Sequence, residues 1–353
     1  MFIYYLFFFI PVFFSLYKSN YKWSLNLSIV ISTIYTLFIG LRDRVGGDWE
    51  TYLEMIDNVE QSYSQILFKP EPLYYYLINF FKNYDGAIYY VNTVCAAIFI
   101  FSLVYFLNTL PRPFLGLSIA FPYLIMVVGG GFTRQSVAIG LSFMVINFIR
   151  KEKIILSVFF GVLALGFHIS GIFVIIYYIP FVYKIIKNNP FYLASVLTLA
   201  GLFIIFLMNI SFEYYYQIYL ATQYSSKGFY VRSFLYCFYA LIFLIYKKKF
   251  TNNDVESRIL ECISYFAFIT LIIGFITPGN TAILDRFSLF LFPVLLIIGT
   301  NLPSLKIKQF PKQITILLIH LNSLFILITW LNFSPFARFW LPYRNILFNP
   351  ISN

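Results

Sequence analysis

Residues 40–52 read GLRDRVGGDWETY, and they open the longest polar interval of the chain, which ends with FKPEP at 68–72. Charged side chains crowd this interval, although Asp, Glu, Lys and Arg make up only 11% of the 353 residues. The sequence on both sides is rich in Phe, Leu, Ile and Tyr. Because charged groups at membrane depth are costly and usually functional, the interval predicts one wall of a polar active site on an otherwise lipid-buried protein.

Composition indicates the fold class. Hydrophobic residues make up 60% of the chain, whereas soluble domains are nearer half apolar and about a quarter charged. We therefore predict an all-α polytopic integral membrane protein, with a single transmembrane domain over 1–353. A bilayer-crossing helix needs about 20 apolar residues, and on that basis we mark about twelve spans. They lie near 1–17, 24–41, 87–108, 114–128, 132–149, 154–167, 169–184, 190–208, 233–247, 258–276, 286–300 and 314–332.

The charge distribution predicts the orientation of these spans. The run 1–17 lacks a basic start and a small-residue cleavage site, so we interpret it as a retained first span rather than a signal peptide. If the gap after it is cytoplasmic and the sides alternate, most Lys and Arg residues fall in cytoplasmic gaps, as the positive-inside rule requires. That rule accounts for the net charge of +11, so no nucleic-acid partner is predicted. Both termini are expected outside.

This topology leaves two extracytoplasmic loops, at 42–86 and 209–232. In the first loop, apolar residues recur at helical spacing while most of the acids fall on the opposite face. The pattern predicts an amphipathic extracytoplasmic helix that lies on the membrane surface. Its apolar residues are Trp49, Tyr52, Leu53, Ile56 and Val59.

Arginines mark the outer ends of several predicted spans. Guanidinium is a planar, permanently charged partner that can bind phosphate oxygens through two parallel hydrogen bonds. Arginines gathered on one outer face therefore predict a clamp for a lipid-linked pyrophosphate. The alternative is that each one simply reaches the lipid headgroups. The four candidates are Arg42, Arg134, Arg232 and Arg286.

Three side chains are candidates for proton transfer or substrate orientation. His168 falls at the predicted outer edge of the bundle, where a neutral imidazole could act as general base on a sugar hydroxyl. The alternative is a histidine packed between helices. Asp48 and Glu71 each belong to a turn punctuated by Gly or Pro. Asp285 could pair with the adjacent Arg286 and orient it.

No cofactor or metal site is predicted. Divalent cations prefer clustered carboxylates, and the acids outside the predicted surface helix mostly have basic neighbours. Cys95, Cys237 and Cys262 are scattered through apolar runs. Their number and spacing favour neither a disulfide framework nor a metal cluster.

Several short motifs follow one another along the chain. They are Gly40-Leu41-Arg42, Val45-Gly46-Gly47-Asp48 with Tyr52, Glu71-Pro72 with Tyr75, Thr133-Arg134-Gln135 with Ala138, Lys151 and Lys153, Phe167-His168-Ile169-Ser170, and Asp285-Arg286. In this order and spacing, residues 35–300 resemble the Wzy/EpsG-type family of bacterial polysaccharide polymerases.

The resemblance implies a GT-C-like glycosyltransferase in the bacterial plasma (inner) membrane, with its active site on the periplasmic or extracytoplasmic face. Its substrates would be undecaprenyl-pyrophosphate-linked oligosaccharides. The growing glycan would pass from its carrier to the non-reducing-end hydroxyl of an incoming lipid-linked repeat unit. A chain-length regulator and a flippase of the same pathway would be its protein partners.

The resemblance also implies roles for the candidate residues. Pyrophosphate would be held by Arg42, Arg134 and Arg286, to which we add Arg232 from its position. His168 or Asp48 would activate the acceptor hydroxyl, and Glu71 would orient the acceptor or an arginine. Acceptor and sugar contacts are expected from Tyr52, Tyr75, Tyr230 and Asp285.

Three other functions remain open from the sequence. A flippase for lipid-linked oligosaccharide would also use outer arginines, but it should carry polar groups at several depths. The short basic cytoplasmic loops favour chemistry on one side instead. An O-antigen ligase would differ in its acceptor, and a membrane O-acyltransferase would need an acyl donor from the cytoplasm.

Overall fold

The structure is a computed structural model, and it describes residues 1–17, 22–59, 66, 70–188, 225–226, 228–250, 254–305 and 311–348. Across these residues the regular structure is helical, apart from one isolated antiparallel bridge between Arg42 and Asn345. The predicted all-α class is confirmed. The predicted span 190–208 and most of the loop 209–232 lie outside the described residues.

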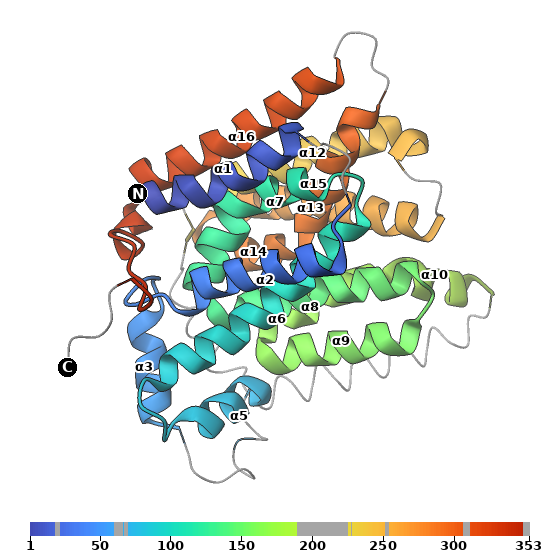
Figure 1. The fold of residues 1–353 in the computed structure, drawn as a ribbon. Helices are drawn as coiled ribbons and strands as arrows, with labels where there is room; N and C mark the ends of the chain where they lie inside the picture. Colours follow the sequence, from blue (N-terminus) through green and yellow to red (C-terminus); the bar gives the residue numbers. More distant parts are fainter. Residues whose placement is uncertain are drawn as a thin grey trace.

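Figure 1 shows the arrangement of the described helices. In order they are α1 (Phe2–Tyr17), α2 (Leu25–Gly40), α3 (Trp49–Asp57), α5 (Pro72–Phe81), α6 (Ala87–Thr109), α7 (Pro113–Ala120), η1 (Phe121–Gly129), α8 (Thr133–Arg150), α9 (Ile154–Phe167), η2 (Ile169–Tyr177), α10 (Ile179–Asn188), α12 (Phe229–Phe250), α13 (Asp254–Ile276), η4 (Pro278–Asn280), α14 (Thr281–Ser288), η5 (Leu289–Leu291), α15 (Phe292–Asn301), η6 (Leu302–Ser304), α16 (Lys312–Phe333) and η7 (Pro335–Phe339).

Long apolar helices make this a multi-pass membrane protein. Within the described ranges, five helical segments are long and apolar enough to cross a bilayer: Ala87–Thr109, Phe229–Phe250, Asp254–Ile276, Pro278–Ser304 and Lys312–Phe333. Shorter apolar helices cover Phe2–Tyr17, Leu25–Gly40, Pro113–Gly129 and Ile154–Phe167. The sequence-based figure of about twelve spans and the GT-C-like architecture stay predictions.

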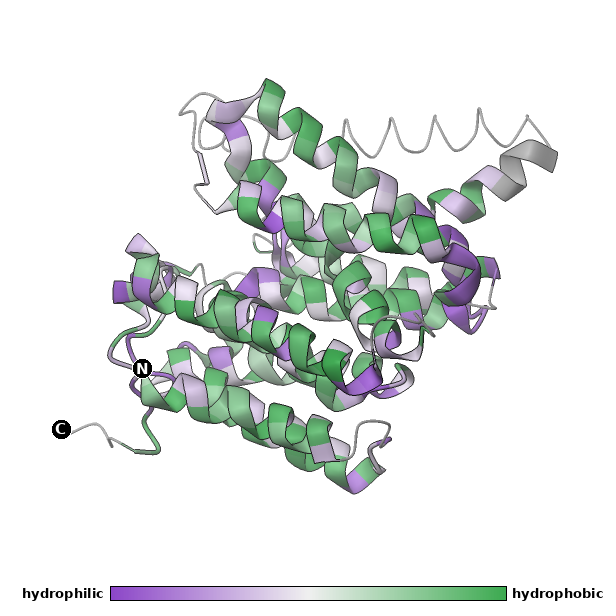
Figure 2. Ribbon diagram, turned by 90° about the horizontal axis from the view of Figure 1, so that it is seen from above, coloured by the Kyte–Doolittle hydropathy of each residue, from purple (hydrophilic) through white to green (hydrophobic). Residues whose placement is uncertain are grey.

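The connections gather at two ends of the helix bundle, and hydrophilic residues gather there too (Figure 2). At one end, α2 and α9 finish and α6 and α8 begin; we call this the site end. Side chains from the loop after α2 contact both following helices there, since the Tyr89 hydroxyl donates to Asp43 (2.8 Å) and Arg42 to Thr133 (2.7 Å).

The other end, which we call the opposite end, carries residues that the sequence assigns to cytoplasmic gaps. Arg150 pairs with Glu256 at 3.1 Å, and Lys247 pairs with Glu261 at 2.7 Å. Arg112 is buried there and donates to the Thr300 carbonyl at 2.6 Å. Basic residues from several predicted cytoplasmic gaps therefore lie together at one end of the bundle. The side of the membrane that this end faces stays a prediction.

A C-terminal segment, residues 335–348, braces the polar loop at the site end. The Asp43 N–H donates to the Arg344 carbonyl (3.0 Å), and the Gly46 N–H donates to the Phe339 carbonyl (2.8 Å). In return the Ile346 N–H donates to the Leu41 carbonyl at 3.0 Å. These bonds satisfy backbone groups that a free loop would leave to water, so the loop has one defined path past the site.

Glycines allow this loop to pack closely on the turn before α8. Gly46 has a φ of +110°, and a Cβ there would lie 2.5 Å from the Gly130 carbonyl oxygen. A Cβ on Gly131 would lie 2.2 Å from the Trp340 ring. Trp340 is buried and its indole N–H donates to the Met126 carbonyl at 2.9 Å. The glycines therefore seat both the loop and the tryptophan against one turn.

The predicted amphipathic segment forms α3. Trp49 and Tyr52 are buried, whereas Glu50, Glu54 and Asp57 are exposed. The apolar face packs on protein rather than on lipid, because α3 contacts α5 and α6. The sequence pattern therefore gave the helix and its two faces, and the structure supplies what covers the apolar one.

Candidate active site

The central feature of the site end is a chain of contacts from Arg134 through Glu71 to His168. Arg134 lies in the first turn of α8, Glu71 directly precedes α5, and His168 lies at the break between α9 and η2. Arg134 Nη1 donates to Glu71 Oε2, and His168 Nε2 lies 3.5 Å from Glu71 Oε1. Three motifs that are far apart in sequence thus meet at one carboxylate.

Glu71 is the most enclosed member of this chain. Its side chain is 3% exposed, against 21% for Arg134, so the arginine is the more exposed partner of the pair. The Ile169 N–H also donates to Glu71 Oε1 at 3.2 Å. Burial alone would raise the pKa of Glu71, but His168, Arg134 and the Ile169 N–H lower it below its ordinary value. Glu71 is therefore an ionised anchor that fixes Arg134.

The hydrogen bonds of His168 fix which ring nitrogen carries the proton. The Ser170 N–H donates to His168 Nδ1 at 3.1 Å, so Nδ1 is an acceptor. The Ser170 hydroxyl lies 2.6 Å from the same nitrogen. The proton of a neutral ring is then on Nε2, which faces Glu71. In this arrangement both ring nitrogens have partners, and His168 positions Glu71.

Two tyrosine rings flank Arg134. Its guanidinium carbon lies 5.7 Å from the ring centre of Tyr52 and 5.6 Å from that of Tyr74. Arg134 Nε and the Tyr74 hydroxyl are buried and have no hydrogen-bond partner within the described part of the chain. Buried polar groups in native proteins are nearly always paired, so these two atoms stand out within the cluster.

Asp48 is the carboxylate that stands more open at this site. It is partly buried at the start of α3. Burial raises its pKa above the ordinary value, while the charges of Arg134 and Arg286 act in the opposite direction. An ionised carboxylate beside two arginines is suited to accept a proton from a bound hydroxyl. The charges of Arg134 and Arg286 therefore act on the Asp48 carboxylate.

Arg42 lies beneath this cluster and is fully engaged in packing. It is 2% exposed, and its nitrogens donate to the Val45 carbonyl (3.0 Å), the Ile39 carbonyl (2.5 Å) and the Thr133 hydroxyl (2.7 Å). These bonds join the polar loop to the first residue of α8. Arg42 thus holds the turn that carries Arg134.

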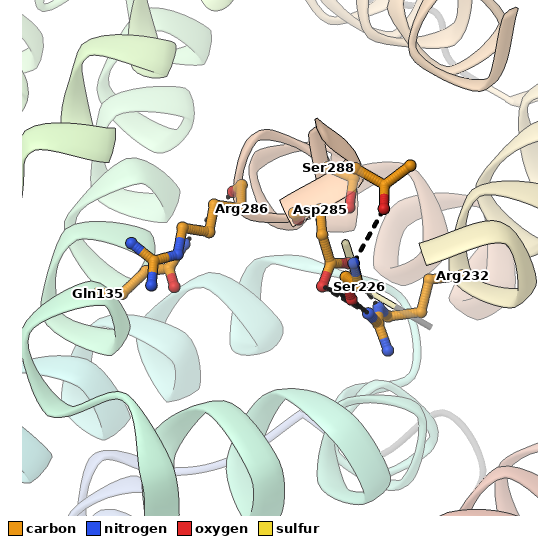
Figure 3. A network of polar contacts seen from close by, with 7 residues as sticks. Gln135, Ser226, Arg232, Asp285, Arg286 and Ser288 are labelled. Atoms are coloured by element: carbon orange, nitrogen blue, oxygen red, sulfur yellow. Dashed lines mark hydrogen bonds and ion pairs between the residues drawn. The ribbon is translucent and has the colours of Figure 1, made fainter. Parts of the chain in front are cut away.

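A second arginine cluster lies on the other side of α14 (Figure 3). Arg232 donates to both oxygens of Asp285, Nε to Oδ1 at 2.8 Å and Nη2 to Oδ2 at 2.5 Å. The Ser226 hydroxyl also donates to Asp285 Oδ2 at 2.8 Å. Arg286 points the other way from the same helix, and its backbone carbonyl accepts from Gln135 at 3.3 Å.

This geometry corrects the predicted partner of Asp285. Both of its carboxylate oxygens accept from Arg232, and Oδ2 also accepts from Ser226, so its ion pair is with Arg232 instead of the adjacent Arg286. Successive residues of a helix point about 100° apart, which separates the two side chains. The predicted outer arginines thus divide into a cluster around Arg134 and Arg286 and a cluster around Arg232.

The predicted tyrosines differ in placement. Tyr52 lies in the Arg134 cluster, and the ring that joins it from α5 is that of Tyr74, which was not among the predicted residues. The Tyr230 hydroxyl donates to the Gly274 carbonyl at 2.9 Å, a contact between α12 and α13. A helical periodicity check on α5 could have favoured Tyr74, since it shares a face with the buried Ile78.

Two further residues belong to these clusters, although the sequence carries no strong signal for them. Ser170 fixes His168, and Tyr123 stacks under Arg232 with 4.5 Å between the guanidinium carbon and the ring centre. Among the described residues, no three His, Cys, Asp or Glu side chains gather into a group that could hold a metal ion.

Comparison with known proteins bears on the predicted resemblance. The model of the EpsG family matches residues 25–345, which include both arginine clusters. Comparison with curated proteins and with solved structures gives no match. The matched segment covers most of the chain, so the resemblance seen in the motifs is confirmed. The chain belongs to the EpsG family, whose function is of the polysaccharide-polymerase type.

Proposed function

We propose that this protein is a polysaccharide polymerase that joins undecaprenyl-pyrophosphate-linked repeat units at the extracytoplasmic face of the bacterial plasma membrane. The observation that carries the proposal is the convergence of Asp48, Glu71, Arg134 and Arg286 at one end of a membrane-embedded bundle. The family gives the class of reaction, and this cluster supplies groups suited to its chemistry.

The donor would be bound by Arg134 and Arg286. A sugar attached to lipid pyrophosphate already has a good leaving group, so the protein must stabilise charge that develops as the bond breaks. Arg134 is anchored on Glu71, and Glu71 is in turn held by the Ile169 N–H and His168. Because the Arg134 guanidinium is already held in place, little energy is lost to its reorganisation when the transition state forms.

The acceptor hydroxyl would be activated by Asp48. Its oxygen attacks the anomeric carbon, the bond from that carbon to the pyrophosphate oxygen breaks, and the electron pair leaves with the lipid pyrophosphate. The hydroxyl proton passes to the Asp48 carboxylate. Asp48 suits this step better than His168, because both imidazole nitrogens already have partners.

A purified-protein elongation assay tests the function. The protein in detergent is given lipid-linked repeat units, and the products are resolved by size. We expect longer lipid-linked glycans from wild type and from Asp57→Asn, which alters an exposed acid of α3, and none from Asp48→Asn. Binding without elongation in the wild type would overturn the proposal.

The same assay separates the competing functions. A flippase would move the lipid-linked units across proteoliposome membranes and leave their length unchanged. A ligase would transfer the glycan to lipid A core but would not extend a second lipid-linked unit. Either product pattern in place of elongation would replace polymerase as the assignment.

A further inference from the structure

A cavity of about 220 Å³ lies beside the Arg232 cluster, between η1, α12, α15 and α16. Its walls are mostly apolar, with Leu235 on α12 and Ile326 on α16 facing it from opposite sides. Tyr123 and Arg232 also line it, so a cation and a phenol ring stand beside hydrocarbon walls. Because Asp285 pairs with this guanidinium, the combination fits an amphiphile whose polar head lies beside the ion pair and whose hydrocarbon lies against the apolar walls.

The cavity borders the lipid-facing surface of the bundle. Val231 and Phe325 line it and are 72% and 67% exposed, respectively. They belong to α12 and α16, two of the helices that are long and apolar enough to cross a bilayer. A hydrocarbon chain could therefore enter sideways from the membrane without passing through water.

The charged side of the cavity adjoins the proposed catalytic cluster. Arg232 is held by Asp285, and Asp285 is followed on α14 by Arg286, which points toward the other side (Figure 3). An anionic group near Arg232 is thus one helix away from the Arg134 cluster. A lipid whose chain lies in the cavity could therefore reach the Arg134 cluster with its pyrophosphate.

Resting on the proposed function, we propose that this cavity binds the head-proximal isoprene units of the donor's polyprenyl carrier. Its volume is below the 300–1,000 Å³ that is typical of pockets for whole small molecules. It therefore holds a short segment of the carrier, and the rest of the chain lies in the bilayer. The contact with Arg232 sets which end of the lipid points toward α14.

Cavity-filling variants test this assignment through donor selectivity. Leu235→Trp and Ile326→Trp fill the cavity from opposite walls, while Leu241→Trp and Leu321→Trp add the same ring at exposed positions of α12 and α16. Each is assayed with two donors, one on a polyprenyl chain and one with an ethyl group in its place. We expect the cavity variants to lower kcat/KM at least 10-fold for the polyprenyl donor, with little change for the ethyl donor.

Equal losses on both donors, or no loss on either, would overturn the assignment. If bilayer phospholipid occupies the cavity instead, the cavity variants should lose activity on neither donor. The matched exposed variants should keep the wild-type ratio between donors.

Photocrosslinking gives a result that does not depend on turnover. A polyprenyl pyrophosphate with a diazirine on its head-proximal isoprene is bound to the wild-type protein, irradiated and mapped by mass spectrometry. We expect adducts in residues 231–239 and 322–326, reduced in Leu235→Trp. Adducts confined to other helices would contradict the cavity assignment, whereas adducts here without elongation would contradict only the proposed function.

Discussion

Arg134 is the side chain on which most contacts of the site converge. Glu71 binds one of its nitrogens, and the rings of Tyr52 and Tyr74 lie on either side. Lysine would keep the charge but lose the planar fork that matches phosphate oxygens. We expect Arg134→Lys to lower the elongation rate by about 100-fold, the scale for losing one transition-state donor. Timed reactions resolved by glycan length measure this.

The matched control for that substitution is Arg44→Lys, an exposed arginine of the polar loop after α2. It should elongate glycans at the wild-type rate and show that lysine itself is tolerated in the region. Both variants should insert into the membrane and purify as the wild type does. Wild-type glycan lengths from Arg134→Lys would show that the guanidinium does not hold the donor.

The pKa of Asp48 predicts how activity responds to pH. The base must be ionised, and its pKa is raised above 3.8 by burial, so activity should fall on acidification at a pH higher than an ordinary aspartate would give. The charge of Arg286 lowers this pKa. Arg286→Gln should therefore move the acidic limb of kcat/KM to higher pH, in addition to any decrease in the rate itself.

The control compares the same limb in His168→Ala. If His168 only positions Glu71, this variant is slower but keeps its acidic limb at the wild-type pH. Loss of the limb in His168→Ala would identify the imidazole as the base and remove Asp48 from that role.

The charged residues of the site were easier to predict from the sequence than the residues they contact. Arg134, Glu71 and His168 stood out because charge is rare in this chain. The pairing of Asp285 with Arg232 was not predictable, since it depends on the direction in which each side chain leaves α14. Tyr74 was missed although its spacing from Ile78 places both on one face of α5, and that face brings its ring to Arg134.

At the scale of elements, the turn before α8 depends on the absence of a side chain at Gly131. An added methyl there would meet the Trp340 ring at 2.2 Å. We expect Gly131→Ala to lower the free energy of unfolding by about 1–3 kcal/mol, as overpacking a core does. The thermal unfolding midpoint of the purified protein measures the change.

Gly47→Ala is the matched control, because a Cβ at that position meets nothing within 4 Å. It should unfold at the wild-type temperature. An unchanged midpoint in Gly131→Ala as well would show that Trp340 can move aside, and the turn would then not depend on close packing against it.

Elements with a local signal were predictable, and those held by distant contacts were not. Apolar runs and helical spacing gave α3 and the apolar helices, with boundaries within a few residues. The bracing role of residues 335–348 had no such signal, because it consists of backbone bonds to a loop almost 300 positions away in sequence. Nothing local in that tail indicates its partner.

At the scale of the molecule, the two ends of the bundle should face different compartments. Glu50 on α3 and Lys153 before α9 are both exposed and lie at the site end and the opposite end, respectively. In a chain with its three native cysteines replaced, Glu50→Cys should react with an impermeant maleimide in intact cells. Lys153→Cys should react only after permeabilisation.

The reverse labelling pattern would place the site in the cytoplasm and contradict the proposed face. Labelling of both positions in intact cells would mean that the helices between them do not alternate as the charge distribution predicts. Reactivity of each cysteine after detergent solubilisation shows that the probe can reach it.

The most direct test of the account is the stoichiometry of a single reaction mixture. Each glycosidic bond formed by transfer from a lipid carrier must release one free undecaprenyl pyrophosphate. With purified wild-type protein and lipid-linked repeat units, we predict one released lipid pyrophosphate per bond, and neither product with Asp48→Asn. Glycan elongation without that release would contradict transfer from a lipid-pyrophosphate carrier. Release and elongation that persist in Asp48→Asn would contradict the role of Asp48 as the base.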